Sequence, residues 1–296
     1  MIDLHTHSTA SDGSYSPSAL LEEAAKRGIS ALALTDHDTV DGLEEARQAA
    51  LERGIRFIPG VELEIEWNEG EFHLLGLSIR QISANLQTAI KELARRREER
   101  NLEIVAMMHK AGITVSYDEI RAIAAGKDLQ SGTDNSGFIP ESYGSIGRPH
   151  FAAFLVRRGI VRNMEHAFDR YLGRGRPFYI PKTGLEFEQA VLAIHESGGL
   201  AILAHPMSLY VSWGRLPNLI KNLKDKRLDG LEAWHPSTNV NACKRLEELA
   251  KNLGLCVTAG SDFHGEARPD RKMGITAGGK KIDDCFLEAL QHILPP

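Results

Sequence analysis

Cysteine and aromatic residues are scarce in this chain of 296 residues, and long apolar runs are missing. The three cysteines, at positions 243, 256 and 285, form no C-x-x-C pair, which predicts reduced thiols and a cytoplasmic protein rather than a disulfide scaffold. No stretch approaches the roughly 18 consecutive apolar residues that a membrane helix needs, and the first residues do not resemble a targeting signal. We therefore expect no membrane partner.

Positive charge is also in short supply: 35 Lys and Arg stand against 40 Asp and Glu, for a net charge of −5. Such a surface repels a long polyanion. An aromatic content of 6% also provides few rings on which bases could stack in a basic groove. Long nucleic acid is thus disfavoured as a partner, whereas a small phosphorylated molecule is not. The hydrophobic content of 42% predicts an ordinary globular core. Nothing in the sequence indicates the oligomeric state.

Short apolar runs alternate with amphipathic helical patterns, which is typical of β/α units around a parallel sheet. The first helix is signalled by Ser16 and Pro17 at its start and by Gly28 at its end. The predicted strands are 1–4, 29–34, 56–61, 72–77, 200–203, 231–234 and 256–259. The predicted helices are 16–28, 40–53, 83–110, 118–125, 150–157, 163–172, 186–197, 241–252 and 283–293.

About 120 residues separate Ile79 from Gly199, far more than one β/α connection takes. The sequence therefore predicts a discontinuous barrel of residues 1–80 and 187–296 that is interrupted by a mainly helical insertion, or lid, of residues 81–186. Within the insertion, the polar stretch at 131–145 is expected to be a loop.

Side chains that can bind metal ions recur at or just after the predicted strands. Because the strand ends of a parallel barrel meet at one mouth, these side chains are expected to gather there. Imidazole and carboxylate ligands without thiolate suit Mn²⁺, Zn²⁺ or Fe²⁺, and nine of them exceed the needs of one ion. Two or three ions are implied, and clustered ions favour phosphate-ester hydrolysis. The nine candidates are His5, His7, Asp12, His37, Glu62, His73, His205, Asp262 and His264.

The order of these motifs, H-x-H, T-D-H-D, G-V-E, A-H-P and S-D-x-H, resembles the polymerase and histidinol phosphatase (PHP) superfamily of phosphoesterases. The resemblance implies a distorted seven-stranded, TIM-like β/α barrel with a trinuclear centre, most often holding Mn²⁺. It implies that His5, His7, Glu62 and Asp262 hold the first ion. Glu62 would bridge to a second ion held by His73 and His205, and Asp12, His37 and His264 would hold the third.

The insertion resembles a narrower branch, the phosphatases of nucleoside 3′,5′-bisphosphates and the enzymes that trim short 5′-phosphorylated RNA from its 5′ end. In that reading Arg148 and Lys182 are candidate phosphate clamps on the lid. His235 is a candidate catalytic residue, either as a phosphate contact or as a proton donor. Asp36 and Asp38, which flank His37, are interpreted as supporting residues.

Three alternatives stay open at this point. A histidinol-phosphate phosphatase would use the same centre, but it does not account for the long insertion. An amidohydrolase also begins with H-x-H, but usually needs a lysine at a strand end, and none is found there. A non-catalytic PHP module stabilised by metal would not need a complete ligand set.

Overall fold

The computed structural model describes residues 1–124 and 146–293, so the polar stretch predicted as a loop at 131–145 lies outside the described residues. The chain forms two compact units, one of residues 1–91 and 184–296 and the other of residues 92–183. Among the described residues, no helix combines the length and the apolar character that a membrane crossing requires.

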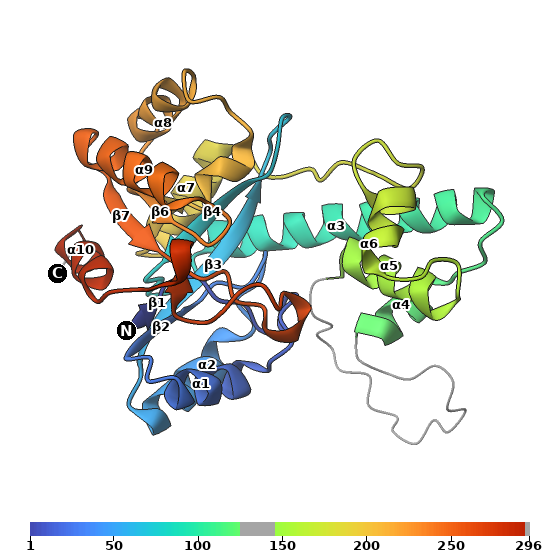
Figure 1. The fold of residues 1–296 in the computed structure, drawn as a ribbon, viewed down its shortest axis with the longest axis horizontal. Coiled ribbons are helices and arrows are strands. Elements are labelled where there is room, and N and C mark those ends of the chain that lie inside the picture. Colours follow the sequence, from blue (N-terminus) through green and yellow to red (C-terminus); the bar gives the residue numbers. More distant parts are fainter. Residues whose placement is uncertain (125–145, 294–296) are drawn as a thin grey trace. The chain divides into compact units, whose positions relative to one another are not determined.

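Seven strands of the first unit form one sheet in the order β1 to β7 (Figure 1). Past the ends of β1 and β7, Thr6 bridges to Phe263, and the His7 N–H donates to the Phe263 carbonyl at 2.9 Å, so that the sheet nearly closes. The predicted seven-stranded barrel is confirmed. The strands are β1 (Ile2–Asp3), β2 (Ala31–Leu34), β3 (Arg56–Ile65), β4 (Phe72–Leu77), β5 (Leu200–Leu203), β6 (Gly230–Trp234) and β7 (Cys256–Ala259).

One strand runs against the others. Strands β1, β2 and β3 are parallel, as are β5, β6 and β7, but β4 is antiparallel to both of its neighbours. The first residues of β4 therefore lie beside the last residues of β3, and His73 pairs with Glu64. His73 lies within the strand predicted at 72–77, near the start of β4, so the antiparallel course of β4 places it on the same side as the carboxyl ends of the parallel strands.

Glu62 departs from its predicted place. The sequence predicts that β3 ends at residue 61, just before Glu62, but the strand continues to Ile65 because its second half pairs with β4 in a hairpin. Glu62 is thus inside the strand, and Glu64 points to the same side two residues further on.

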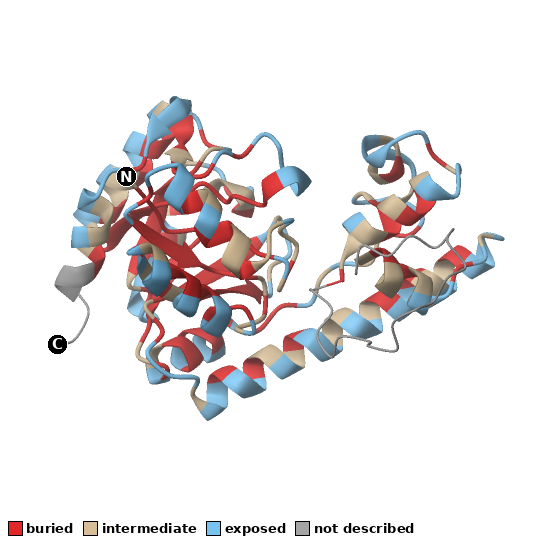
Figure 2. Cartoon of the chain, turned by 90° about the horizontal axis from the view of Figure 1, so that it is seen from below, coloured by how far each residue is buried: buried red, intermediate tan, exposed pale blue. Residues whose placement is uncertain are grey.

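Helices surround the barrel, and Figure 2 shows its strands as almost wholly buried. In α1, the Ser16 side chain accepts a hydrogen bond from the Ala19 N–H, Leu20 and Leu21 are buried, and Gly28 follows with φ of 70°. The motif signals for this helix are confirmed, whereas α8 was not predicted. The helices of this unit are α1 (Pro17–Lys26), α2 (Leu43–Arg53), α7 (Phe187–Glu196), α8 (Leu216–Asp225), α9 (Val240–Asn252) and α10 (Cys285–Ile293).

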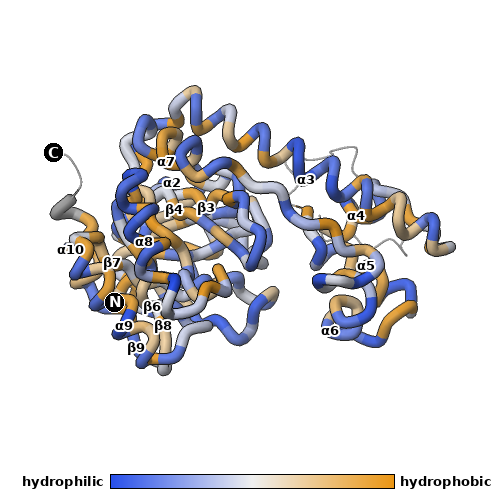
Figure 3. The backbone as a smooth tube through the Cα atoms, turned by 90° about the horizontal axis from the view of Figure 1, so that it is seen from above, coloured by the Kyte–Doolittle hydropathy of each residue, from blue (hydrophilic) through white to orange (hydrophobic). Residues whose placement is uncertain are grey.

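The second unit has a hydrophobic core of its own, in which Ile104, Met108, Phe151 and Phe154 are buried. Helix α3 begins within the first unit and ends in the second, and its residues alternate between hydrophilic and hydrophobic along its length (Figure 3). The helices are α3 (Ala84–Lys110), α4 (Tyr117–Ala124), α5 (Arg148–Arg157) and α6 (Met164–Ala167), the last continuing as a π-helical turn over Phe168–Leu172.

Candidate functional site

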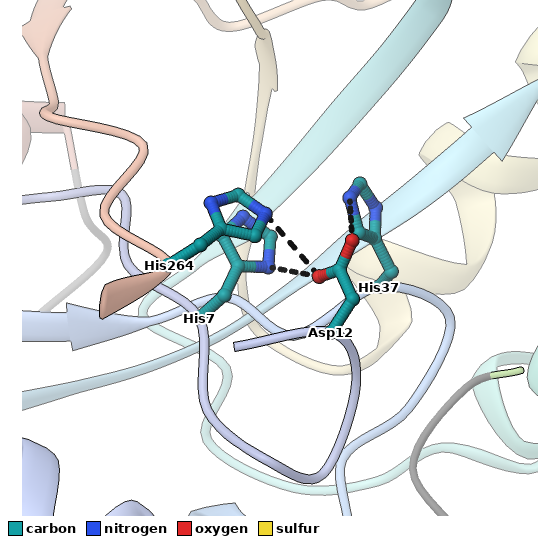
Figure 4. Close-up of side chains that lie close together, drawn as sticks. All are labelled: His7, Asp12, His37 and His264. Carbon is teal, nitrogen blue, oxygen red and sulfur yellow. Dashed lines mark ion pairs between the residues drawn. The ribbon is translucent and has the colours of Figure 1, made fainter. Parts of the chain in front are cut away.

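All nine predicted ligand residues meet in one connected cluster at the barrel mouth. Three groups within it have ligand atoms close enough together to hold a metal ion. One of them comprises His7, Asp12, His37 and His264, with the Asp12 carboxylate facing the three rings (Figure 4). The other two groups are His5 with His7 and Asp262, and His37 with Glu62 and His73.

Glu62 lies at the centre of the cluster, with a side chain that is 1% exposed. Its Oε1 is 3.0 Å from both His73 Nδ1 and His205 Nε2. Its Oε2 is 3.0 Å from His37 Nδ1, 3.3 Å from His7 Nε2 and 3.4 Å from His5 Nε2. Each oxygen therefore faces a different set of rings, which is the arrangement that a bridging carboxylate requires.

In most of these histidine rings, one nitrogen contacts a hydrogen-bonding group on the outside of the cluster. The other nitrogen then points toward the inside of the cluster. A ring that donates N–H to an outer acceptor keeps the lone pair of its other nitrogen for a metal ion. The outer contacts are His5 Nδ1 with Glu232 Oε1 at 3.0 Å, His73 Nε2 with Glu64 Oε2 at 3.1 Å, His205 Nδ1 with Ser208 Oγ at 2.8 Å and His264 Nδ1 with the Asp262 carbonyl at 2.8 Å. The Ser208 hydroxyl itself donates to the Glu71 carbonyl, so it accepts from His205.

Two observations test whether divalent ions fit this cluster. The Glu62 Oε2 atom is buried and has no hydrogen-bond partner within residues 1–124 and 146–293, although three ring nitrogens surround it. His5 Nε2 and His7 Nε2 face each other at 3.1 Å, and although burial lowers the pKa of His5, Glu232 and Glu62 raise it well above its ordinary value. Two ring nitrogens this close need a proton or a metal cation between them, because their lone pairs would otherwise repel one another. The residues present therefore fit metal ions.

The electrostatics of the cluster keep its carboxylates ionised. Burial by itself raises the pKa of Glu62, but the surrounding His37, His73 and His5 hold it well below its usual value. Burial lowers the pKa of His264, yet the nearby Asp12 and Asp262 carboxylates more than offset this and bring it to about 9. Without ions, protons would thus take over part of the neutralising role that ions have in such a site.

The backbone is strained at several of these positions. His205 and Asp262 have φ of 25° and 54°, in the region that favours glycine, and the surrounding structure must hold them there. Gly260 has a different constraint: a Cβ at this position would lie 2.3 Å from the Cβ of His5. Only glycine lets the strand that leads to Asp262 pass so close to the first motif.

Sequence reasoning missed the outer partners Glu64 and Glu232. The available signals were a second carboxylate two residues after Glu62, and an acidic residue in the otherwise apolar strand β6. Asp36 was interpreted as a supporting residue, and in the structure it accepts hydrogen bonds from the Ser8 N–H and hydroxyl and from the Ser11 hydroxyl.

The three predicted substrate residues lie in different units. His235 follows β6 and is 3% exposed, and its Nε2 is 3.3 Å from Asp262 Oδ2. Arg148 and Lys182 belong to the second unit, where the Arg148 guanidinium lies over the Tyr179 ring, 5.2 Å from its centroid. Their contact with a substrate stays a prediction.

A nearly closed β/α barrel with imidazoles and carboxylates clustered at its mouth is typical of barrel proteins that bind metal ions, and this chain has both features. The chain belongs to the PHP domain family, whose model matches residues 3–188. It is 35% identical over 262 residues to a 5′-3′ exoribonuclease of Haemophilus influenzae, covering 88% of this chain and 89% of that protein. It is 34% identical to a 3′,5′-nucleoside bisphosphate phosphatase of Chromobacterium violaceum, covering 93% and 91%.

Among solved structures, the chain is similar to an amidohydrolase from Chromobacterium violaceum with bound sulfate and no metal. The TM-score is 0.81 at 32% identity, and the alignment covers 98% of this chain and 96% of that one. The similarity thus extends over both units of the chain.

Proposed function

We propose that this PHP phosphoesterase acts on phosphorylated nucleotides. It would release the 3′-phosphate of a nucleoside 3′,5′-bisphosphate, trim short 5′-phosphorylated RNA in the 5′ to 3′ direction, or do both. The observation that carries the proposal is the set of inward-facing ring nitrogens around Glu62. The exoribonuclease and the bisphosphate phosphatase support a nucleotide substrate over histidinol phosphate.

The proposed centre holds three divalent ions, with Mn²⁺ expected and Zn²⁺ or Fe²⁺ as alternatives. When bound, such ions lower the pKa of water and neutralise the charge on a phosphoryl group. The outer contacts of His5, His73 and His264 support this assignment. The proposed sets are His5, His7, Glu62 and Asp262; Glu62, His73 and His205; and Asp12, His37 and His264.

The proposed reaction is hydrolysis with in-line displacement at phosphorus. Water gives up one proton to solvent as its oxygen forms the new bond to phosphorus, the bond from phosphorus to the ester oxygen breaks, and the leaving oxygen takes up one proton. His235 contributes an N–H at Nε2, because its Nδ1 accepts a hydrogen bond from the Ser237 N–H at 3.2 Å. We assign His235 to the leaving or phosphoryl oxygen beside Asp262.

Residues 81–186 are proposed to be the lid domain that accompanies the catalytic barrel of 1–80 and 187–296, with Arg148 and Lys182 binding phosphate of the substrate. We also infer a cytoplasmic location, which is supported by three free thiols, two of them buried.

A direct comparison of substrates tests the proposal. Mn²⁺-loaded protein is incubated with adenosine 3′,5′-bisphosphate, a short 5′-phosphorylated RNA and histidinol phosphate, and released phosphate and nucleotides are measured to give kcat/KM. We expect a nucleotide substrate to exceed histidinol phosphate by at least about tenfold, which is roughly 1.4 kcal/mol of transition-state binding. A preference of that size for histidinol phosphate would overturn the proposal. Metal analysis of the same sample gives the number of ions per chain.

A further inference from the structure

The two carboxylate oxygens of Asp262 face different surroundings. Oδ1 lies 3.4 Å from His7 Nε2 and 3.6 Å from His5 Nε2, on the side of the inward-facing nitrogens. Oδ2 lies 3.3 Å from His235 Nε2 and 3.9 Å from Arg271 Nε, on the side away from those nitrogens. Asp262 therefore separates the candidate metal ligands from a pair of nitrogen donors.

Arg271 is the unexpected member of that pair. Its side chain is only 8% exposed, and its Nε is buried without a hydrogen-bond partner among the described residues. Its closest acidic contacts are the Asp270 carboxylate at 3.4 Å and Asp262 at 3.9 Å, and neither makes a hydrogen bond to Nε. Burying a guanidinium in this way is unfavourable unless acceptors satisfy its fixed fork of donors. The two carboxylates balance its charge, but they leave the Nε hydrogen-bonding capacity unused.

His235, which also lies beside Asp262 Oδ2, resembles Arg271 in having a buried side-chain nitrogen, Nε2, that makes no hydrogen bond in the part of the chain that the structure describes. Since Nδ1 accepts the Ser237 N–H, the neutral ring carries its proton on Nε2 and is a donor there. Two unsatisfied buried donors, one of them cationic, thus lie beside the same carboxylate oxygen at the edge of the cluster.

The loop that carries Arg271 is anchored on both sides. The Arg271 N–H donates to the Arg268 carbonyl at 2.9 Å, and the Gly274 N–H donates to Asp3 Oδ2 at 2.7 Å beneath the barrel mouth. Met273, between the two anchors, is buried in the core. These anchors fix the backbone on both sides of Arg271, and the ion pairs with Asp270 and Asp262 add to the positioning of its guanidinium.

We propose that Arg271 is a substrate-binding residue whose guanidinium, together with His235 Nε2–H, binds the oxygens of the phosphoryl group that is cleaved. The ligand class is a phosphate monoester or diester anion, because a planar guanidinium matches two phosphoryl oxygens and a single N–H matches a third. This inference rests on the proposed phosphoesterase function, and it adds a cation from the barrel unit itself to those expected on the second unit.

The test compares Arg271→Met and Arg271→Lys with the control Arg268→Met. Arg268 lies in the same loop and also contacts Asp270, at 3.5 Å, but its side chain is 46% exposed. Each Mn²⁺-loaded protein is titrated with inorganic phosphate by calorimetry, its metal content is measured, and kcat and KM are determined with adenosine 3′,5′-bisphosphate. We expect Arg271→Met to weaken phosphate binding about tenfold to a hundredfold at unchanged metal content, Arg271→Lys to recover part of the loss, and Arg268→Met to match the parent.

Two results would overturn the inference. In one, Arg271→Met binds phosphate as tightly as the parent. In the other, it loses metal and regains full phosphate affinity once metal is restored, which would make Arg271 a positioning residue for Asp262. Failure of the proposed function looks different: the parent protein would release neither phosphate nor nucleotide from any of the nucleotide substrates. The phosphate titration and the metal content would still decide the role of Arg271 in that case.

Discussion

The barrel mouth and the helices of the second unit use the same charged residue types in opposite ways. At the mouth, Glu62 is 1% exposed and is surrounded by five imidazoles. On α3, Glu99 is 57% exposed and pairs with Arg95 one helical turn away. An exposed pair of this kind contributes little to stability, whereas burying a carboxylate among other polar groups is unfavourable by several kcal/mol unless they are fully satisfied.

The difference in burial indicates that the charged residues on α3 and those at the barrel mouth have different roles. The pairs on α3 keep a helix surface polar and stabilise it slightly. The buried set at the mouth instead concentrates groups whose mutual repulsion is relieved by a bound cation, and such a set is expected to serve chemistry.

Removing one member of the buried set has the largest expected effect. We expect His37→Ala or Asp262→Asn to lower kcat/KM by more than about a hundredfold, because each removes a proposed ligand, and even outer partners of metal ligands contribute tenfold to a hundredfold. Steady-state kinetics and circular dichroism check activity and fold. The matched control is His195→Gln, since His195 lies in the same unit and pairs with Asp229 at 2.6 Å instead. Full activity in either ligand variant would refute the cluster.

The pH dependence of the metal-free protein comes next in size. The folded-state pKa of His264 is about 9, above its ordinary 6.5, so its contribution to stability is fully present below about pH 6.5 and is lost as the pH rises through 9. Burial holds the pKa values of His37 and His235 below the ordinary value of 6.5, so these two rings are already neutral as the pH rises toward 9.

We therefore expect the contribution of His264 to the free energy of unfolding of protein treated with a chelator to fall by about 2 kcal/mol between pH 7 and 9. Urea unfolding at several pH values measures this fall. His264→Gln should reduce the fall without abolishing it, because Glu232 and Glu62 outweigh the effect of burial and raise the pKa of His5 well above its ordinary value as well. Added Mn²⁺ should flatten the profile. A flat profile in the metal-free parent would contradict the arrangement of charges around His264.

An intermediate effect is expected in the second unit. Arg148→Ala should raise KM for adenosine 3′,5′-bisphosphate about tenfold and change kcat little, because a phosphate contact remote from the reacting bond contributes uniform binding. The control is Arg158→Ala, whose side chain is 54% exposed and pairs with Glu119. An unchanged KM would remove Arg148 from the substrate site and leave the second unit without its proposed role.

The smallest effect is expected on α3. Arg95→Gln removes an exposed partner of Glu92, which keeps Arg96, and of Glu99, and we expect it to leave the midpoint of thermal unfolding almost unchanged, with no effect on kcat/KM. Thermal unfolding and the nucleotide assay measure the two quantities. A loss of activity here would show that surface charge on α3 takes part in function, and the comparison drawn above would fail.

Much of the barrel could be predicted because its signals are local. The bounds of β4, β5 and β7 coincide with the predicted runs, and the capping residues of α1 lie where the sequence placed them. The end of β3 could not be predicted, because its last residues are held by pairing with β4 rather than by their own pattern. Helix α8 was missed although Leu216, Ile220 and Leu223 form a buried stripe at helical spacing.

By itself, the sequence determined which residue types can hold metal ions and in what order they occur, because ligand chemistry belongs to the residue. Only the tertiary structure decided how each ligand is oriented. Glu232 holds the His5 ring from 227 positions away, and the antiparallel course of β4 brings His73 to the mouth from its strand's opposite end. Ring orientation and the unsatisfied donor of Arg271 depend on contacts between distant segments, and such contacts exist only once the barrel has closed.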